Sequence, residues 1–138
     1  MEKQHDTFID LHLGTPVWFT LLARLLPVAL FVQFVTAGLG LFLDTQLIGL
    51  HMTLGFILAL PPLGLLTGAL MVRRLRGFGW WAGVVFLLYL VQVALAAGGN
   101  PLPMSLHPAN GALLLAASLV LLFKVERRRA QLSPAARA

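Results

Sequence analysis

The chain has 138 residues, the length of about one domain, and 59% of them are hydrophobic while only 11% are charged. Soluble domains carry about 25% charged residues, so this composition, with a mean hydropathy of +0.87, excludes a water-soluble globule and predicts an integral membrane protein. The net charge of +5 sits at the ends of apolar segments, which argues against nucleic acid as a partner, and the absence of cysteine excludes disulfides, thiolate metal sites and covalently attached haem.

The first apolar segment follows a polar lead-in, residues 1–14, which is interpreted as an N-terminal tail. Thr15 followed by Pro16 predicts a helix start, with the threonine as cap and the proline in the first helical position. Arg24 is interpreted as an interfacial side chain that extends back toward water. Residues 25–43 are almost entirely apolar and long enough to form the first transmembrane helix.

The second apolar segment covers residues 47–71, and Asp44 just ahead of it is a suitable N-cap. Pro61 and Pro62 lie within this segment, so a kinked helix is expected. The loop that follows it is basic and contains Arg73, Arg74 and Arg76.

Two further apolar segments complete the chain. A third helix is predicted over residues 78–97, and the Gly- and Pro-rich stretch 98–103 ends it. Ser105 is the predicted cap of a fourth helix over residues 106–125, which places Pro108 in the first turn, where its missing N–H costs little.

The predicted fold is therefore all-α, an integral membrane four-helix bundle over residues 15–129. It lies between a cytoplasmic N-terminal tail, residues 1–14, and a disordered C-terminal tail, residues 130–138. A bacterial or archaeal cell membrane is the expected location.

The basic residues also predict the topology. Every Lys and Arg lies in the N-terminal region, in the loop between the second and third helices or in the C-terminal region, whereas the two other loops carry only Asp44 as a charge. By the positive-inside rule both termini are cytoplasmic. His51 and His107 follow the two outward loops, so both are expected near the outer face, whereas His5 and His12 are interpreted as solvated.

Matching residues in the two halves of the chain predict a 2+2 internal repeat with parallel orientation. In each half a glutamine is followed by small residues and, past an outward loop, by a His-x-x-x-Gly motif. Glutamine and histidine are costly in lipid unless they face the bundle, so their recurrence is informative. The matched positions are Gln33, Ala37, His51 and Gly55 in the first half and Gln92, Ala96, His107 and Gly111 in the second.

The two histidines are predicted to lie at similar depth on two helices, where their imidazoles could hold one haem iron from both sides. The glycine one turn deeper on each helix leaves room for a porphyrin edge, and the small residues add room from the neighbouring helices. A main-chain carbonyl or a glutamine side chain could accept a hydrogen bond from the second ring nitrogen. The predicted metal ligands are His51 and His107, and the predicted cofactor-binding set adds Gly55, Gly111, Gln33, Gln92, Ala37 and Ala96.

These residues resemble a known family. The run Val91-Gln92 through Ala96-Ala97-Gly98, followed by Pro103 and Leu106-His107, is similar to one half of haem A synthase, and the stretch from Gln33 to Gly55 resembles the same pattern more loosely. The resemblance covers residues 28–123 and implies a four-helix bundle with a b-type haem held by two histidines. Small single-bundle membrane families with the same His-x-x-x-Gly pair match the chain better in size.

The resemblance supports haem binding rather than catalysis. The substrate half of haem A synthase carries a glutamate just ahead of a histidine, but Ile48-Gly49-Leu50 precede His51 and offer no carboxylate. An electron-transfer or haem-handling protein with haem b is therefore favoured over an enzyme. Two alternatives stay open: a half-size haem A synthase that acts as a homodimer, and a cofactor-free accessory or assembly subunit. The expected partners are membrane lipids and either a second copy or a larger membrane redox complex.

Overall fold

The computed structural model describes residues 14–132, and within that range every regular element is a helix. Four helical runs are long and apolar enough to cross a membrane, which confirms, for these residues, the all-α fold with four helices of spanning length. The elements are α1 (Val17–Phe42), α2 (Leu47–Ile57), α3 (Leu60–Met71), the 3-10 helix η3 (Arg73–Phe78), α4 (Gly79–Ala97) and α5 (Pro101–Leu132). The tail histidines His5 and His12 lie outside the described residues.

Helix α1 begins one residue later than the sequence predicted. Pro16 occupies the cap position, and no side chain caps the helix. The Thr15 hydroxyl lies 3.1 Å from Thr20 Oγ1, and the Thr20 hydroxyl donates to the Pro16 carbonyl at 3.2 Å. The expected Thr15 cap is therefore wrong, because the hydroxyl that would cap the helix bonds to another side chain instead.

The second span is interrupted as its prolines predicted. Leu58 and Ala59 separate α2 from α3, and Pro61 and Pro62 lie in the first turn of α3. The Ala59 N–H turns back to the Phe56 carbonyl at 3.0 Å, a tightened final turn. Proline lacks an N–H and its ring collides with the carbonyl four residues earlier, so the break comes just before the pair.

Helix α5 begins at Pro101, well before the predicted start at residue 106. The Asn100 side chain accepts from the Leu102 N–H at 3.3 Å, and proline suits the first helical position. Ser105 does not cap the helix, because its hydroxyl donates to the Leu102 carbonyl within the first turns. Pro108 consequently lies inside the helix rather than in its first turn.

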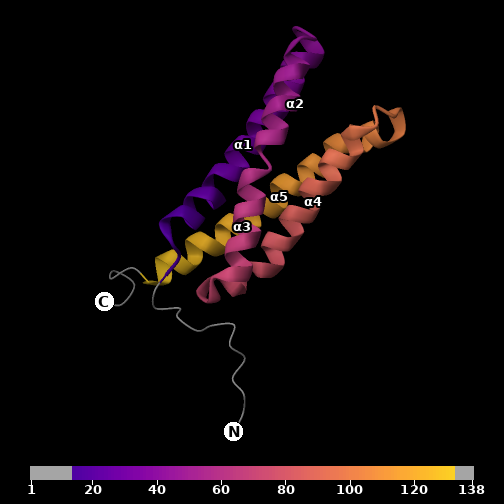
Figure 1. The fold of residues 1–138 in the computed structure, drawn as a ribbon. Coiled ribbons are helices and arrows are strands. Elements are labelled where there is room, and N and C mark those ends of the chain that lie inside the picture. Colours follow the sequence, from indigo (N-terminus) through magenta and orange to yellow (C-terminus); the bar gives the residue numbers. More distant parts are fainter. Residues whose placement is uncertain (1–13, 133–138) are drawn as a thin grey trace.

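The packed core lies in the half of the bundle where α1 begins and α5 ends. Buried side chains from α1, α3, η3, α4 and α5 meet there, whereas α2 contributes no buried residue. Figure 1 shows the α1–α2 and α4–α5 hairpins diverging toward their loops, away from the end where α1 begins and α5 ends. The core includes Phe19, Leu26, Leu65, Leu75, Val85, Leu121 and Val125, all almost fully buried.

Arginine side chains connect the helices at the end of the bundle where α1 begins and α5 ends. The Arg24 Nε donates to Glu126 Oε1 at 2.6 Å, so Arg24 pairs with α5. Arg128 donates through Nη1 to the Arg74 carbonyl, and its guanidinium lies 5.5 Å from the centroid of the Phe78 ring. These contacts join α5 to α1 and to η3.

Glycines allow the helices to approach closely. A Cβ at Gly64 would lie 2.8 Å from Leu22 Cδ1, and one at Gly68 would collide with the Trp18 ring and approach Phe19. Their four-residue spacing therefore serves the packing of α3 on α1 within the chain, as small residues commonly do between membrane helices.

Gly40 allows α1 and α2 to pack closely against each other. Its replacement therefore provides a test of stability. An added Cβ would lie 2.5 Å from Ile48 Cδ1 and 3.0 Å from the Ile48 backbone nitrogen. Gly40→Ala is expected to destabilise the protein by about 1–3 kcal/mol, because the hairpin must open to admit the methyl group. The midpoint of thermal unfolding in detergent measures this effect.

Gly38→Ala is the matched control, since a Cβ at Gly38 meets nothing within 4 Å. Alanine also has the higher helix propensity, by up to about 1 kcal/mol, so this variant is expected to be neutral or stabilised. Equal melting temperatures for the two variants would contradict the close approach at Gly40.

Candidate functional site

His51 lies on α2 and is held by α1. Its Nδ1 lies 3.1 Å from the Gln33 backbone carbonyl, and the Thr36 hydroxyl, 3.3 Å from Nδ1, donates to the same carbonyl at 3.1 Å. With the proton on Nε2, Nδ1 would accept from the Thr36 hydroxyl or the Gln33 amide. With the proton on Nδ1, the ring donates to the Gln33 carbonyl and its Nε2 is an acceptor. That is the protonation state in which a histidine binds a metal through Nε2.

His107 lies on α5 and is held in the same way by α4. Its Nδ1 lies 3.1 Å from the Gln92 backbone carbonyl. The partner of each ring is thus a carbonyl of the glutamine that the sequence had singled out, but it belongs to the main chain of the neighbouring helix. The Gln92 amide bonds to Asn110 instead, whereas the Gln33 amide also lies within hydrogen-bond distance of His51 Nδ1.

The two rings meet between the hairpins. Their centroids are 6.2 Å apart and the ring planes are inclined at 69°. An imidazole nitrogen binds a metal ion at about 2 Å, so two rings that share one ion have centroids roughly 6 Å apart. The two rings can also rotate about their bonds to a shared ion, so an inclined pair is compatible with a shared ligand. His51 and His107, far apart in the sequence, are therefore close enough to act as one donor pair.

The Gln92 side chain is fixed by an asparagine that the sequence analysis did not select. Asn110 is 8% exposed, and its Nδ2 donates to the Leu88 carbonyl at 2.9 Å and to Gln92 Oε1 at 2.7 Å. The signal for this contact was an amide in an otherwise apolar stretch, three residues after His107 on the same helical side. Asn110 thereby ties α5 to α4 one turn from the histidine.

Gln33 joins α1 to α2 beside the other histidine. In the amide orientation that satisfies both ends, its Oε1 accepts from the Gly55 N–H, and its Nε2 contacts both the His51 carbonyl and His51 Nδ1, each at 3.0 Å. The Tyr89 hydroxyl, from α4, donates to the Gly55 carbonyl at 3.1 Å. This second missed residue connects the two hairpins at the depth of the glycine.

The two glycines face these glutamines. A Cβ at Gly55 would lie 3.7 Å from Gln33 Oε1, and a Cβ at Gly111 would lie 3.2 Å from Gln92 Nε2 and 3.3 Å from Phe34 Cζ. The position that a side chain would occupy at each glycine thus faces the glutamine amide of the same hairpin. Of the two alanines in the predicted set, Ala37 is half-buried and Ala96 is exposed.

The donor pair suits a metal that brings ligands of its own. Within residues 14–132 no group of three or more His, Cys, Asp or Glu side chains is placed to hold a metal ion. Zinc sites take three or four protein ligands, whereas a haem iron already has four porphyrin nitrogens and takes two axial ones. Two imidazoles would match the two axial positions of such a group.

Comparison with known proteins adds one finding. The model of a family of unknown function, DUF6220, matches residues 33–98. The matched segment includes Gln33, His51, Gly55 and Gln92 and ends before His107. Neither a curated protein nor a solved structure matches the chain.

Proposed function

We propose that this protein is a membrane b-type haem protein, with His51 and His107 as the axial ligands, that transfers electrons or handles haem. The observation that supports the proposal most strongly is the 6.2 Å separation of the two rings, each anchored through Nδ1 by a backbone carbonyl. Anchoring of this kind fixes the tautomer and the ring orientation before a ligand arrives.

The chain's own residues would do three things for the cofactor. His51 and His107 hold the iron, the carbonyls of Gln33 and Gln92 keep both Nε2 atoms available, and the apolar helices exclude water. A haem iron with two imidazole ligands supplies reversible one-electron chemistry, and the apolar surroundings influence its potential. With both axial positions filled, electron transfer is favoured over oxygen chemistry.

The internal repeat and the topology belong to the same proposal. In each hairpin a histidine contacts the carbonyl of a glutamine on the preceding span, at 3.1 Å in both cases, which supports a 2+2 repeat. Among the described residues, Lys and Arg gather at the end of the bundle opposite the histidines, which by the positive-inside rule supports a cytoplasmic location for both termini. The haem would then lie near the outer face.

Spectroscopy of the full chain tests the proposal. The protein is purified in mild detergent, incubated with haem b and freed of excess haem, and its reduced-minus-oxidised spectrum is recorded. A sharp low-spin α band, one haem per chain and little reaction with carbon monoxide are expected. A protein that stays colourless after this treatment would overturn the proposal and favour the cofactor-free accessory subunit. Conversion of added haem O would instead favour the half-size haem A synthase.

A further inference from the structure

The two histidines of the candidate site differ in what surrounds their Nδ1 atoms. Among residues 14–132, the hydrogen-bond partner of His107 Nδ1 is the Gln92 carbonyl, at 3.1 Å. A carbonyl oxygen accepts hydrogen bonds and cannot donate one, so it selects the tautomer with the proton on Nδ1. The Gln92 side chain bonds to Asn110 rather than to the ring. The surroundings of His107 therefore favour a single tautomer.

His51 Nδ1 lies beside two hydrogen-bond donors as well as a carbonyl. The Gln33 carbonyl is 3.1 Å away, the Thr36 hydroxyl 3.3 Å and the Gln33 amide nitrogen 3.0 Å in its bonded orientation. The carbonyl favours a proton on Nδ1, whereas either donor stabilises a ring with its proton on Nε2. A protonated Nε2 has no lone pair to offer a metal. His51 thus has two competing tautomers, of which only one can bind iron through Nε2.

Thr36 contributes the donor that is specific to the first hairpin. Its side chain is 7% exposed, and its hydroxyl lies 3.1 Å from the Gln33 carbonyl and 3.3 Å from His51 Nδ1. A hydroxyl carries one proton, so it donates to one of these two acceptors at a time. Without it, an unprotonated Nδ1 would face the carbonyl oxygen, acceptor against acceptor, with the Gln33 amide as its remaining donor. Thr36 therefore stabilises the tautomer of His51 that does not bind.

The helices that carry the two rings differ in the same sense. Helix α2 has no buried residue. In α5, by contrast, Asn110 and Gly111 are buried in the turn after His107, and the Asn110 side chain donates to the Leu88 carbonyl of α4. Segments with few buried contacts open more readily than those in a packed core. His51 therefore combines a competing tautomer with the less firmly packed helix.

We propose that Thr36 makes His51 the exchangeable ligand of the pair, whereas His107 is the permanent one. This role rests on the proposed haem function and deepens it, because a ligand binds only the fraction of the protein that is in the competent state. Uptake and release of haem would begin at His51 while His107 stays bound. An unequal pair of this kind suits a protein that takes up haem and passes it on. Thr36 acts through His51 and is a positioning residue.

Nitrogen-15 NMR of the haem-free full chain in detergent tests the tautomers directly, because protonated and unprotonated imidazole nitrogens have well-separated chemical shifts. His107 is expected to show the pattern of a ring protonated at Nδ1, and His51 a mixture of the two tautomers. Thr36→Val should move the His51 signals toward the His107 pattern, and Thr36→Ser, which keeps the hydroxyl, should leave them as in the wild type. Identical patterns for the two rings of the wild type, or unchanged His51 signals in Thr36→Val, would overturn the proposal.

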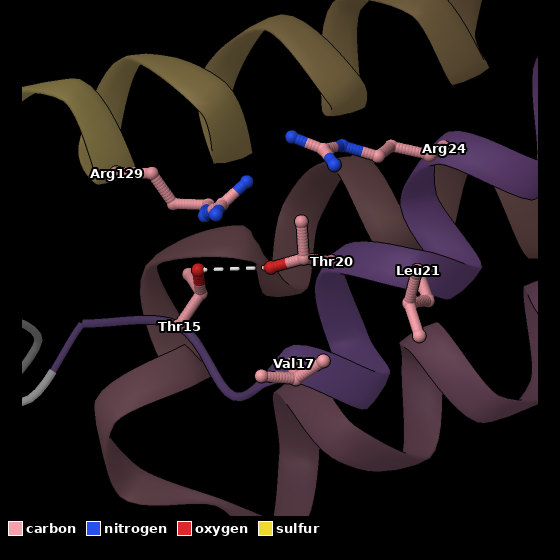
Figure 2. Close-up of a pocket in the computed structure, with 6 residues that line it drawn as sticks. All are labelled: Thr15, Val17, Thr20, Leu21, Arg24 and Arg129. Carbon is pink, nitrogen blue, oxygen red and sulfur yellow. Dashed lines mark hydrogen bonds between the residues drawn. The ribbon is translucent and has the colours of Figure 1, made fainter.

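Thr20→Val is the matched control for the loss of a buried hydroxyl from α1. Thr20 is 4% exposed and lies about four helical turns before Thr36. Its hydroxyl donates to the Pro16 carbonyl and lies 3.1 Å from Thr15 Oγ1, the contact that Figure 2 shows. This variant should leave the NMR signals of both rings unchanged.

Haem affinity provides the second measurement, by competition with apomyoglobin. Thr36→Val should bind haem roughly two- to tenfold more tightly than the wild type, the range that one hydrogen bond contributes. Thr36→Ser and Thr20→Val should bind as the wild type does. Equal or weaker binding by Thr36→Val would contradict a hydroxyl that opposes ligation. A chain that binds no haem but shows the expected NMR patterns would overturn the haem function, and with it the ligand role, but not the tautomer difference.

Discussion

Replacement of His107 or His51 by alanine is expected to abolish the low-spin spectrum of the haem-loaded protein. Each variant keeps one imidazole, so its iron becomes high-spin and reacts with carbon monoxide, and haem occupancy falls at least about tenfold. Each histidine is proposed to supply one ligand to the same iron, His51 from α2 and His107 from α5. The two substitutions should therefore have similar effects. The absorption spectrum and the pyridine haemochrome assay measure spin state and occupancy.

Met52→Leu is the control for these variants. Methionine also ligates haem iron in some cytochromes, and Met52 is adjacent to His51 but 57% exposed. The low-spin spectrum should survive this substitution unchanged. Loss of the spectrum in Met52→Leu together with its retention in His51→Ala would move the ligand to the neighbouring residue and contradict the histidine pair.

Asn110→Leu is expected to give the second large effect, a loss of about 1–3 kcal/mol in the free energy of unfolding. The substitution keeps the number and branching of the side-chain heavy atoms but removes the donor that serves Leu88 O and Gln92 Oε1. A buried acceptor left without a donor costs more than the hydrogen bond itself contributed. Denaturation in detergent, followed by circular dichroism in the absence of haem, provides the measurement.

Tyr89→Phe is the companion variant. It removes a single neutral hydrogen bond, from the hydroxyl to the Gly55 carbonyl, and should cost only about 0.5–1.5 kcal/mol. If Asn110→Leu proved no more destabilising than Tyr89→Phe, the Asn110–Gln92 contact would not be a main link between α4 and α5. With haem bound, Asn110→Leu should also weaken retention of the cofactor, because Gln92 holds the His107 ring.

The spans were predictable because hydropathy alone determines them. Twenty apolar residues in sequence have few structures available in lipid other than a helix, and Pro61 with Pro62 could only interrupt one. Helix starts were less predictable, since several residues offer competing signals. Ser105 is a good cap by type, yet Asn100 and Pro101 start α5 earlier, and prolines in a first turn do not prevent this.

The candidate site was predictable in its residues but not in its contacts. The spacing of His51 and His107 from their loops indicated equal depth, and the structure brings the rings together. The sequence could not distinguish a glutamine side chain from its carbonyl as the ring's partner, because that depends on helix rotation. Asn110 was missed because one amide in an apolar segment has no periodic signal.

The uneven distribution of buried side chains along the second span has a consequence for how the molecule opens. Amide hydrogens of α2 should exchange with solvent deuterium well before those of α3, since α3 is clamped in the core and α2 has no buried residue. The hairpin tips can then separate while the other end stays assembled. A planar ligand such as haem could then bind and dissociate from the loop side while the rest of the protein stays folded.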